Sequence, residues 1–239
     1  MSLNGKRVVL IGGTSGIGFA AAKLAAAEGA SVVVASSKQD RVDDAVKQLG
    51  GDAEGYRLDV TDEAQISEFF TRVGEFDHLV YTAGDALLMK ALAEVTVAEA
   101  KAFFDIRYWG AFLSAKHGAP GIRPGGSIVV SSGSVATRPA PGTSVAASST
   151  AAAESLARAL AVELGPAVRV NAVRPGPAKT AMWDASVPNA QDIYDTFGPH
   201  LLTKRVAEAT EVAEAYIYLL NNTFTTGTVL TVDGGHVLV

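Results

Sequence analysis

Residues 7–29, RVVLIGGTSGIGFAAAKLAAAEG, join a short β-branched run, a glycine-rich turn and an alanine-rich helical stretch. Gly12, Gly16 and Gly18 have the spacing G-x-x-x-G-x-G. Glycine allows a tight turn and lets the backbone approach a pyrophosphate closely, and a helix N-terminus favours the anion. Glycines alone would be weak evidence, but a strand before them and a helix after them predict a dinucleotide-binding turn.

Short apolar runs alternate with helical stretches along the rest of the chain. The runs cover residues 7–13, 30–36, 78–84, 126–132, 168–176 and 227–235. Their apolarity is continuous, which is typical of parallel strands that are buried on both faces. The alternation predicts an α/β fold, a Rossmann-type doubly wound parallel sheet flanked by helices, with ligands at the carboxyl ends of the strands.

We expect residues 1–239 to form a single domain with a substrate loop or lid at about 177–205. Proline, aspartate and aromatic residues follow a strand end there, a composition that suits a binding loop. Met182, Trp183 and Phe197 would make this lid apolar. They favour a small-molecule substrate that is apolar or contains a ring.

Composition excludes several classes of function. At 48% apolar and 19% charged, 239 residues can bury a substantial core, and a net charge of −5 without a basic run predicts no nucleic-acid or membrane partner. The absence of cysteine excludes disulfides and thiolate metal sites, so no metal is expected, and it suits a reducing cytoplasm. No apolar stretch reaches the roughly 20 residues that a spanning helix needs. We therefore expect a cytoplasmic protein.

Later motifs, in the same order along the chain, resemble those of the short-chain dehydrogenase/reductase family. They are LDV at 58–60, TAG at 82–84, RPGPAKT at 174–180 and TTGTVLTVDGG at 225–235. The resemblance covers almost the whole chain and implies an NAD(P)-dependent oxidoreductase that forms a homodimer or homotetramer. Alanine-rich helices at 98–118 and 147–164 would allow close packing of subunits, although alanine also simply favours helix.

The resemblance also implies which residues contact the cofactor. Thr82 stands where the family has asparagine, and the P-G-x-x-x-T stretch would hold the nicotinamide carboxamide. The expected cofactor-binding residues are Gly12, Thr14, Ser15, Gly16, Ile17, Gly18, Ser36, Ser37, Lys38, Asp59, Val60, Thr82, Ala83, Gly84, Pro175, Gly176 and Thr180.

The end of the second strand indicates which cofactor is used. An acidic residue there would bind the ribose hydroxyls of NAD(H), but Ser36, Ser37 and Lys38 offer two hydroxyls and a cation with no acid before Asp40. This combination fits a 2′-phosphate better, and we expect NADP(H) rather than NAD(H). The alternative is that Lys38 is an ordinary solvated residue and the site is indifferent.

The family's Tyr-x-x-x-Lys motif is missing from residues 141–160, PGTSVAASSTAAAESLARAL. An ungapped register places Ala146 and Thr150 at the two positions, and a shift by one places Val145 and Ser149 there. In the family the tyrosine passes a proton to the substrate, and such an acid is worth about 100- to 10,000-fold in rate. Ketone reduction should therefore be crippled while cofactor binding remains.

Three residues are candidates for catalysis instead. Ser132 and Ser134 follow the strand that carries the family's serine, and either hydroxyl could hold a substrate oxygen or merely cap the strand. Arg107 aligns with the family's helical asparagine, on a stripe that should face the sheet. Its guanidinium could stabilise an oxyanion or bind a carboxylate, or it could form a buried ion pair.

Three functions remain open at this point. The first is an NADP(H)-dependent oxidoreductase that acts on a carbonyl, imine or activated alkene with a proton from solvent, substrate or a relocated residue. The second is an enzyme without net redox turnover, or one that couples reduction to ring formation. The third is an NADP(H) sensor or scaffold without catalysis.

Overall fold

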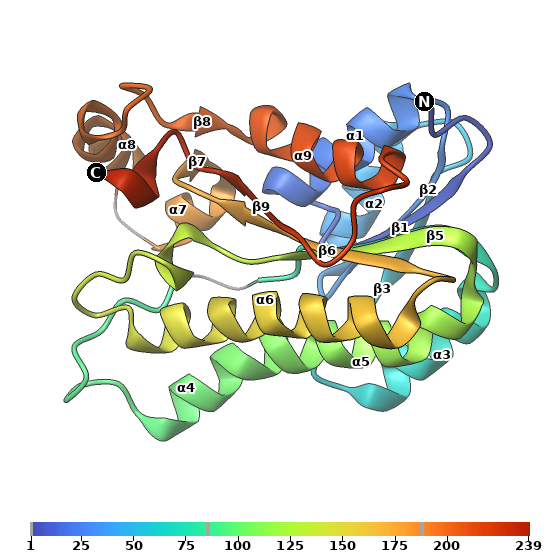
Figure 1. Cartoon of the computed structure of the whole chain (residues 1–239), viewed down its shortest axis with the longest axis horizontal. Helices are drawn as coiled ribbons and strands as arrows, with labels where there is room; N and C mark the ends of the chain where they lie inside the picture. The colour runs from blue at the N-terminus through green and yellow to red at the C-terminus, as the bar shows by residue number, and fades with distance from the viewer. Residues whose placement is uncertain (1, 85–86, 187–188) are drawn as a thin grey trace.

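The computed structural model describes residues 2–84, 87–186 and 189–239, and its centre is one parallel sheet (Figure 1). The strand order is β3-β2-β1-β4-β5-β6-β9, and every neighbouring pair is parallel. The strands are β1 (Arg7–Ile11), β2 (Ser31–Ser36), β3 (Glu54–Arg57), β4 (Phe76–Tyr81), β5 (Ile122–Ser131), β6 (Arg169–Pro175) and β9 (Val229–Val232). The predicted doubly wound parallel sheet is confirmed.

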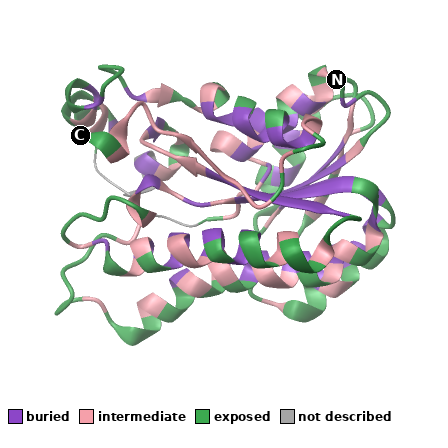
Figure 2. Cartoon of the chain, viewed as in Figure 1, coloured by how far each residue is buried: buried purple, intermediate pink, exposed green. Residues whose placement is uncertain are grey.

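Helices cover both faces of this sheet (Figure 1). One face carries α1 (Gly16–Ala27), α2 (Gln39–Leu49) and α9 (Ala209–Asn221). The other carries α3 (Glu63–Val73), α4 (Val97–Phe104), α5 (Gly110–Gly118) and α6 (Ser144–Leu164). Figure 2 shows buried residues along the strands and on the inner sides of the helices. Val8 packs into the core on one face of the sheet, and the next residue, Val9, packs into the core on the other face. Both faces of the strand are buried, which explains why its sequence is continuously apolar.

β3 is the one strand of this sheet that the apolar pattern missed. It has the sequence EGYR, and its residues alternate between half-buried and exposed. As one of the two edge strands it has a neighbour on one side alone. A continuous apolar run is not required of such a strand, so the search for such runs passed over it.

The segment at 177–205 contains short elements of its own. They are β7 (Ala178–Lys179), α7 (Ala181–Ser186), α8 (Ala190–Phe197) and the single turn η4 (Gly198–His200). β7 pairs with β8 (Ala207–Glu208) in a separate two-stranded sheet. This pairing brings the two ends of the segment side by side, and α9 begins directly after β8. Within the described ranges, no helix is long and apolar enough to cross a membrane.

Candidate functional site

The glycine-rich turn after β1 lies directly against the turn after β4. Gly12 has φ +84°, and a Cβ built there would lie 2.5 Å from the backbone nitrogen of Ala83. A Cβ on Gly18 would lie 2.3 Å from the carbonyl oxygen of Gly12 and 2.3 Å from Oγ1 of Thr82. Both separations are far below van der Waals contact. Glycine is required at both positions because the two turns meet without space for a side chain.

Helix α1 begins at this turn with its N-terminal donors available. Ser15 precedes the helix in an extended conformation, and its side chain makes no capping hydrogen bond. No acidic residue lies in the first turn of α1. Unpaired N–H groups and the helix dipole make such a terminus favourable for a phosphate. Thr14 lies in the same turn, and Ile17 packs against the core beneath α1.

Thr180 follows β6 and β7 and lies against the same glycine-rich turn, although it is far from that turn in the sequence. A Cβ on Gly16 would lie 3.3 Å from Cγ2 of Thr180. Oγ1 of Thr180 is buried and has no hydrogen-bond partner within the described part of the chain. A buried hydroxyl without a partner is costly, so the site fits a polar group supplied by a ligand. Pro175 ends β6, and a Cβ on Gly176 would lie 2.6 Å from Cα of Asp233.

The end of β2 places the predicted phosphate-binding residues at the surface. Ser36 is the last residue of β2, and Ser37 and Lys38 are exposed before α2 begins. Nε of Arg57 donates a hydrogen bond of 3.3 Å to the carbonyl oxygen of Ser37. This second cation was missed because it ends β3, the strand that the apolar pattern did not reveal.

The residues after β3 are partly engaged with the protein itself. Oδ1 of Asp59 accepts hydrogen bonds from the backbone nitrogen of Thr61 at 2.9 Å and from its hydroxyl at 2.7 Å. Val60 is buried, and its Cβ would lie 3.1 Å from a Cβ on Gly110. Asp59 therefore shapes the turn, while Val60 packs beneath the helix that carries Arg107.

Arg107 lies beside the carboxyl end of β4. A Cβ built on Gly84 would lie 2.8 Å from Nη1 of Arg107, so the guanidinium covers the backbone of this glycine. Cζ of Arg107 lies 4.6 Å from the centre of the Phe103 ring, and Nη2 lies 3.8 Å from Sδ of Met182 in α7. The sequence predicts that Arg107 faces the sheet, and in the structure its guanidinium lies over Gly84, past the end of β4. Arg107 lies between the turn after β4 and the 177–205 segment.

A π-helical turn, η1 (Asp105–Trp109), carries Arg107. The backbone N–H of Gly110 bonds to the carbonyl of Asp105, five residues back. The carbonyl of Ile106 instead accepts a hydrogen bond from the hydroxyl of Tyr81 at the end of β4. Tyr81 is 2% exposed, and burial raises the pKa of its phenol although Arg107 opposes this. The sequence predicted a regular helix here, and the π-turn results from this contact with the strand.

Ser132, which directly follows β5, belongs to a buried polar network with side chains from α6 and β6. Its hydroxyl donates to Oε1 of Glu154 at 2.7 Å, and Glu154 pairs with Arg174 through two contacts of 2.7 Å each. Burial tends to raise the pKa of Glu154, but Arg174 and Ser132 outweigh it and hold that pKa below the usual range. Arg174 also donates to the Thr231 hydroxyl at 3.2 Å. The hydroxyl of Ser132 is thus committed to an ionised carboxylate.

Ser134 makes a different contact. It lies in η3 (Ser134–Ala136), past the carboxyl end of β5, and is 8% exposed. Its Oγ lies 2.9 Å from Nδ1 of His236 in η5 (His236–Leu238). Sequence reasoning missed His236, because 102 residues separate it from Ser134 and no motif includes it.

The two positions of the missing motif offer no replacement acid. Ala146 is 6% exposed, and the Thr150 hydroxyl donates to the Ala146 carbonyl at 2.8 Å within α6. In the shifted register, Ser149 is fully buried and its Oγ has no partner within the described ranges. Neither register contains a phenol or an ammonium group. These two positions therefore hold no side chain that could take the place of the family's tyrosine and lysine.

Comparison with known proteins gives the class of the chain. A family model described as "Enoyl-(Acyl carrier protein) reductase" matches residues 12–236. "Short-chain dehydrogenase/reductase ATR9" of Stachybotrys chlorohalonatus is 35% identical over 252 residues, which cover 98% of each chain. The chain therefore belongs to the short-chain dehydrogenase/reductase family.

Two solved structures are similar over nearly the whole chain. A small-chain dehydrogenase in complex with NADPH has a TM-score of 0.86 at 38% identity, covering 98% of this chain and 99% of that one. MalC Reductase/Diels-Alderase from Malbranchea aurantiaca has a TM-score of 0.91 at 32% identity, covering 99% and 98%.

Proposed function

We propose that the chain is an NADP(H)-dependent oxidoreductase that reduces a carbonyl, an imine or an activated alkene with a proton source other than the family's tyrosine. The observation that carries this proposal is the meeting of the glycine turn, the buried Thr180 hydroxyl and Arg107 at one edge of the sheet. The first fits a dinucleotide, the second offers it a polar contact, and the third adds a positive charge beside it.

We expect different residues at this edge of the sheet to bind different parts of the cofactor. The N-terminus of α1 with Ser15 would hold the pyrophosphate, and Val60 would border the adenine. Thr180 would hold the carboxamide, the place that the family resemblance gives it. The bound nicotinamide would supply a hydride.

Two cations and two hydroxyls support NADP(H) over NAD(H). Ser36, Ser37, Lys38 and Arg57 come together where β2 and β3 end. Positive charge and hydroxyl donors favour a 2′-phosphate, whereas the family uses an acidic residue for the ribose hydroxyls of NAD(H). The similar small-chain dehydrogenase in complex with NADPH agrees with this choice.

Arg107 would stabilise negative charge on the substrate. A guanidinium remains protonated at neutral pH, which makes it a poor proton donor but a good partner for an oxyanion or a carboxylate. Its contact with Met182 puts this charge at the border of the 177–205 segment. Within that segment Trp183 is 9% exposed, and its ring lies 6.2 Å from that of Phe197. We propose this segment as an apolar lid that favours a ring-containing substrate.

A second candidate function is reduction coupled to ring formation. It is favoured by the likeness to MalC, described as a reductase/Diels-Alderase, at a TM-score of 0.91. In this version Arg107 and the lid aromatics would hold a reduced intermediate while a ring closes. A product analysis that finds the same cyclised isomer distribution with and without protein would exclude this version.

We also propose that the protein forms a homodimer or homotetramer through α4, η1, α5 and α6. Trp109 is 48% exposed there. It lines a surface groove together with Phe104, Tyr108, Ala152, Ser155, Leu156 and Ala159. An exposed aromatic groove beside small residues suits self-association. Light scattering that gives a monomeric mass at all concentrations would exclude this assembly.

The test of the proposed function is a fluorescence titration with NADPH and NADH, followed by NADPH oxidation against a panel of ketones, imines and activated alkenes. We expect NADPH to bind more tightly and at least one panel member to be reduced. Arg107→Ala should lower kcat about 100- to 1,000-fold, as removal of an oxyanion donor does. Arg72→Ala is the matched control, because Arg72 also lies over an aromatic ring, that of Tyr56 at 5.2 Å.

The outcomes separate the oxidoreductase from the other two functions that the sequence leaves open. Tight NADPH binding with turnover that depends on Arg107 supports the oxidoreductase. Tight binding without turnover on any panel member favours an enzyme without net redox turnover, or a sensor or scaffold. Absence of NADPH binding would overturn the cofactor assignment and the function with it.

A further inference from the structure

His236 is held at the rim of the proposed site by contacts on three sides. Its backbone N–H bonds to the carbonyl of Asp233 at 3.1 Å, and its own carbonyl accepts from Nη1 of Arg138 at 2.6 Å. Its ring bonds to Oγ of Ser134 at 2.9 Å through Nδ1. Backbone and ring are both fixed, so the imidazole has a defined position relative to Ser134.

The turn that carries His236 is also stabilised within itself. Oδ1 of Asp233 accepts from the backbone N–H of Gly235, and Oδ2 accepts from that of Val237, each at 2.9 Å. Gly235 has φ +82°, and a Cβ there would lie 2.5 Å from Cδ1 of Leu202. This packing joins the turn to the end of the lid segment. The placement of His236 therefore does not depend on the Ser134 contact alone.

Contacts continue from His236 through the lid to Arg107. The His236 ring lies 6.1 Å from the Phe197 ring at 77°, and the Phe197 ring lies 6.2 Å from that of Trp183. Met182, the neighbour of Trp183, contacts Arg107. Arg107 and the Ser134–His236 pair therefore border the same lid, at the edge of the sheet where β4 and β5 end.

We propose that Ser134 and His236 form a proton relay that replaces the missing tyrosine, with Ser134 as the catalytic residue that contacts the substrate and His236 as the residue that positions and reprotonates it. This inference rests on the proposed function, because it needs a reduced nicotinamide as the reductant. The Ser132 hydroxyl does not suit this role, since it is committed to Glu154.

The proton transfers balance without a further reactant. When the substrate carbon gains a hydride, an electron pair remains on its oxygen or nitrogen. The O–H bond of Ser134 breaks as a new O–H or N–H bond forms on the substrate, and the serine oxygen takes the proton from Nδ1 of His236. In the same step Nε2 accepts a proton from a solvent molecule, so the ring stays neutral and the one proton consumed per turnover is drawn from bulk solvent through the buffer. The ring then returns to its first tautomer by exchange with solvent.

The charged groups around His236 are compatible with a relay at neutral pH. Burial lowers the pKa of His236 below its usual 6.5, the positive charge of Arg138 lowers it further, and Asp233 opposes both. The ring is therefore mostly neutral at pH 7, the form with one donor and one acceptor nitrogen that a relay needs. His236 is partly exposed, so it can exchange protons with solvent.

The test compares His236→Gln with the wild type in the NADPH oxidation assay on the best substrate of the panel. We expect kcat to fall about 10- to 100-fold, within the range of a lost acid–base group, while KM and the Kd for NADPH change less than about twofold. The matched control is His117→Gln, whose histidine pairs with Glu63 on the outer helices. In His236→Ala, added imidazole should restore part of the lost rate, which a purely structural histidine would not allow.

A second readout needs no turnover. Nitrogen-15 NMR of the histidine rings in the ligand-free protein reports which ring nitrogen of His236 carries the proton. We expect a population protonated on Nδ1, which is lost or shifted in Ser134→Ala. A neutral ring protonated on Nε2 alone would overturn the relay in the reducing direction.

The two proposals fail in different ways. If the wild type reduces a panel member and His236→Gln does so at the same rate, the relay is overturned and the proposed function stands. If the wild type binds no NADPH or reduces no panel member, the proposed function fails and the relay with it.

Discussion

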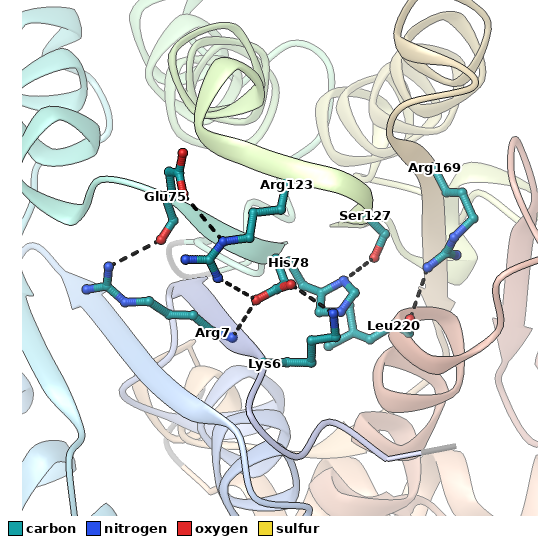
Figure 3. A network of polar contacts seen from close by, with 9 residues as sticks. Lys6, Arg7, Glu75, His78, Arg123, Ser127, Arg169 and Leu220 are labelled. Carbon is teal, nitrogen blue, oxygen red and sulfur yellow. Dashed lines mark hydrogen bonds and ion pairs between the residues drawn. The ribbon is translucent and has the colours of Figure 1, made fainter.

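Strand β4 joins two regions of opposite character. At its amino end, Asp77 and His78 are buried. Figure 3 shows His78 in a network of polar and charged side chains. At its carboxyl end, Tyr81 leads into the turn that meets the glycine loop and Arg107. Both ends bury polar groups. They differ in where those groups find their partners.

At the amino end the protein itself supplies the partners. Asp77 accepts from Nζ of Lys6 at 3.0 Å, from the backbone N–H of Arg7 at 2.9 Å and from Nη1 of Arg123 at 3.1 Å. Nδ1 of His78 lies 2.9 Å from the Ser127 hydroxyl. Among the described residues of this network, Nε of Arg169 is an exception without a partner. Buried networks in which most polar atoms are paired within the protein favour one fold.

At the carboxyl end the protein leaves polar groups without partners among its own described residues. The Thr180 hydroxyl has no partner within the described ranges, and Ser15 makes no capping bond to the free N-terminus of α1. Changes at this end should therefore act on binding and turnover, and changes at the amino end should act on stability.

The largest effect should come from Gly12→Ala at the carboxyl end. The added Cβ would face the Ala83 backbone at 2.5 Å, in a conformation with φ +84°. We expect NADPH affinity to fall about 100-fold, equivalent to about 3 kcal/mol, because the turn must move out of the cofactor site. Fluorescence titration measures this change.

Gly51→Ala is the matched control for strain alone. Gly51 has φ +56°, but a Cβ there would meet nothing within 4 Å. This variant should lose about 1 kcal/mol of unfolding free energy and keep the NADPH affinity. An equal loss of affinity in both variants would show that Gly12 acts through general stability, against the distinction between the two ends.

The buried His78 at the amino end of β4 should make the free energy of unfolding depend on pH. Burial lowers the pKa of His78 to about 4, with help from the positive charges of Arg169 and Lys6 and against Asp77. Between pH 6.5 and 4 the unfolded state binds a proton that the folded state refuses, so stability falls as pH falls through this window. From pH 7 to pH 4.5 the wild type should lose about 2 kcal/mol more than His78→Gln.

Urea unfolding of both proteins at the two pH values measures this difference. Asp77 has its own pKa held below the usual range: burial would raise it, but the contacts with Arg7 and Lys6 prevail. Its contribution is therefore present above about pH 4 and is lost below it, outside the measured window. Equal pH dependence in the two proteins would mean that His78 is not kept neutral by the fold.

The fold was more predictable from the sequence than the catalytic part of the site. Continuous apolar strands and the spacing of Gly12, Gly16 and Gly18 depend on local chemistry, and the expected parallel sheet is confirmed. Arg57 and His236 could not be found in this way. Arg57 contacts Ser37, and His236 contacts Ser134, and both partners are distant in the sequence. No periodic pattern of residues marks these positions.

The π-turn at Arg107 was unpredictable for a related reason. Nothing in residues 105–109 requires a wider turn by itself, and the cause is Tyr81 on another element. A residue added to one helical turn rotates the residues that follow by about 100° relative to those before it. The direction of Arg107 and its neighbours is therefore set jointly by the helix and the end of β4.

The smallest effect in this comparison should come from Tyr81→Phe, which tests that joint control. Without the phenol, the Ile106 carbonyl can again accept from Gly110, and the turn can tighten toward an α-helix. We expect kcat to fall about tenfold because Arg107 shifts away from Gly84, a loss at the low end of those for misplaced charged groups. NADPH affinity should stay the same, and the measurement is the kcat of the panel reaction beside the NADPH titration.

Tyr216→Phe separates this positioning from the loss of a buried hydrogen bond. Tyr216 is fully buried in α9, and its hydroxyl lies 2.6 Å from that of Ser131. Both variants should lose about 1 kcal/mol of unfolding free energy, but Tyr81→Phe alone should lower kcat. If kcat falls equally in both, the π-turn has no special role. If kcat falls in Tyr81→Phe alone and the double variant with Arg107→Ala is no slower than Arg107→Ala, the phenol acts through Arg107, since residues that work as a unit are not additive.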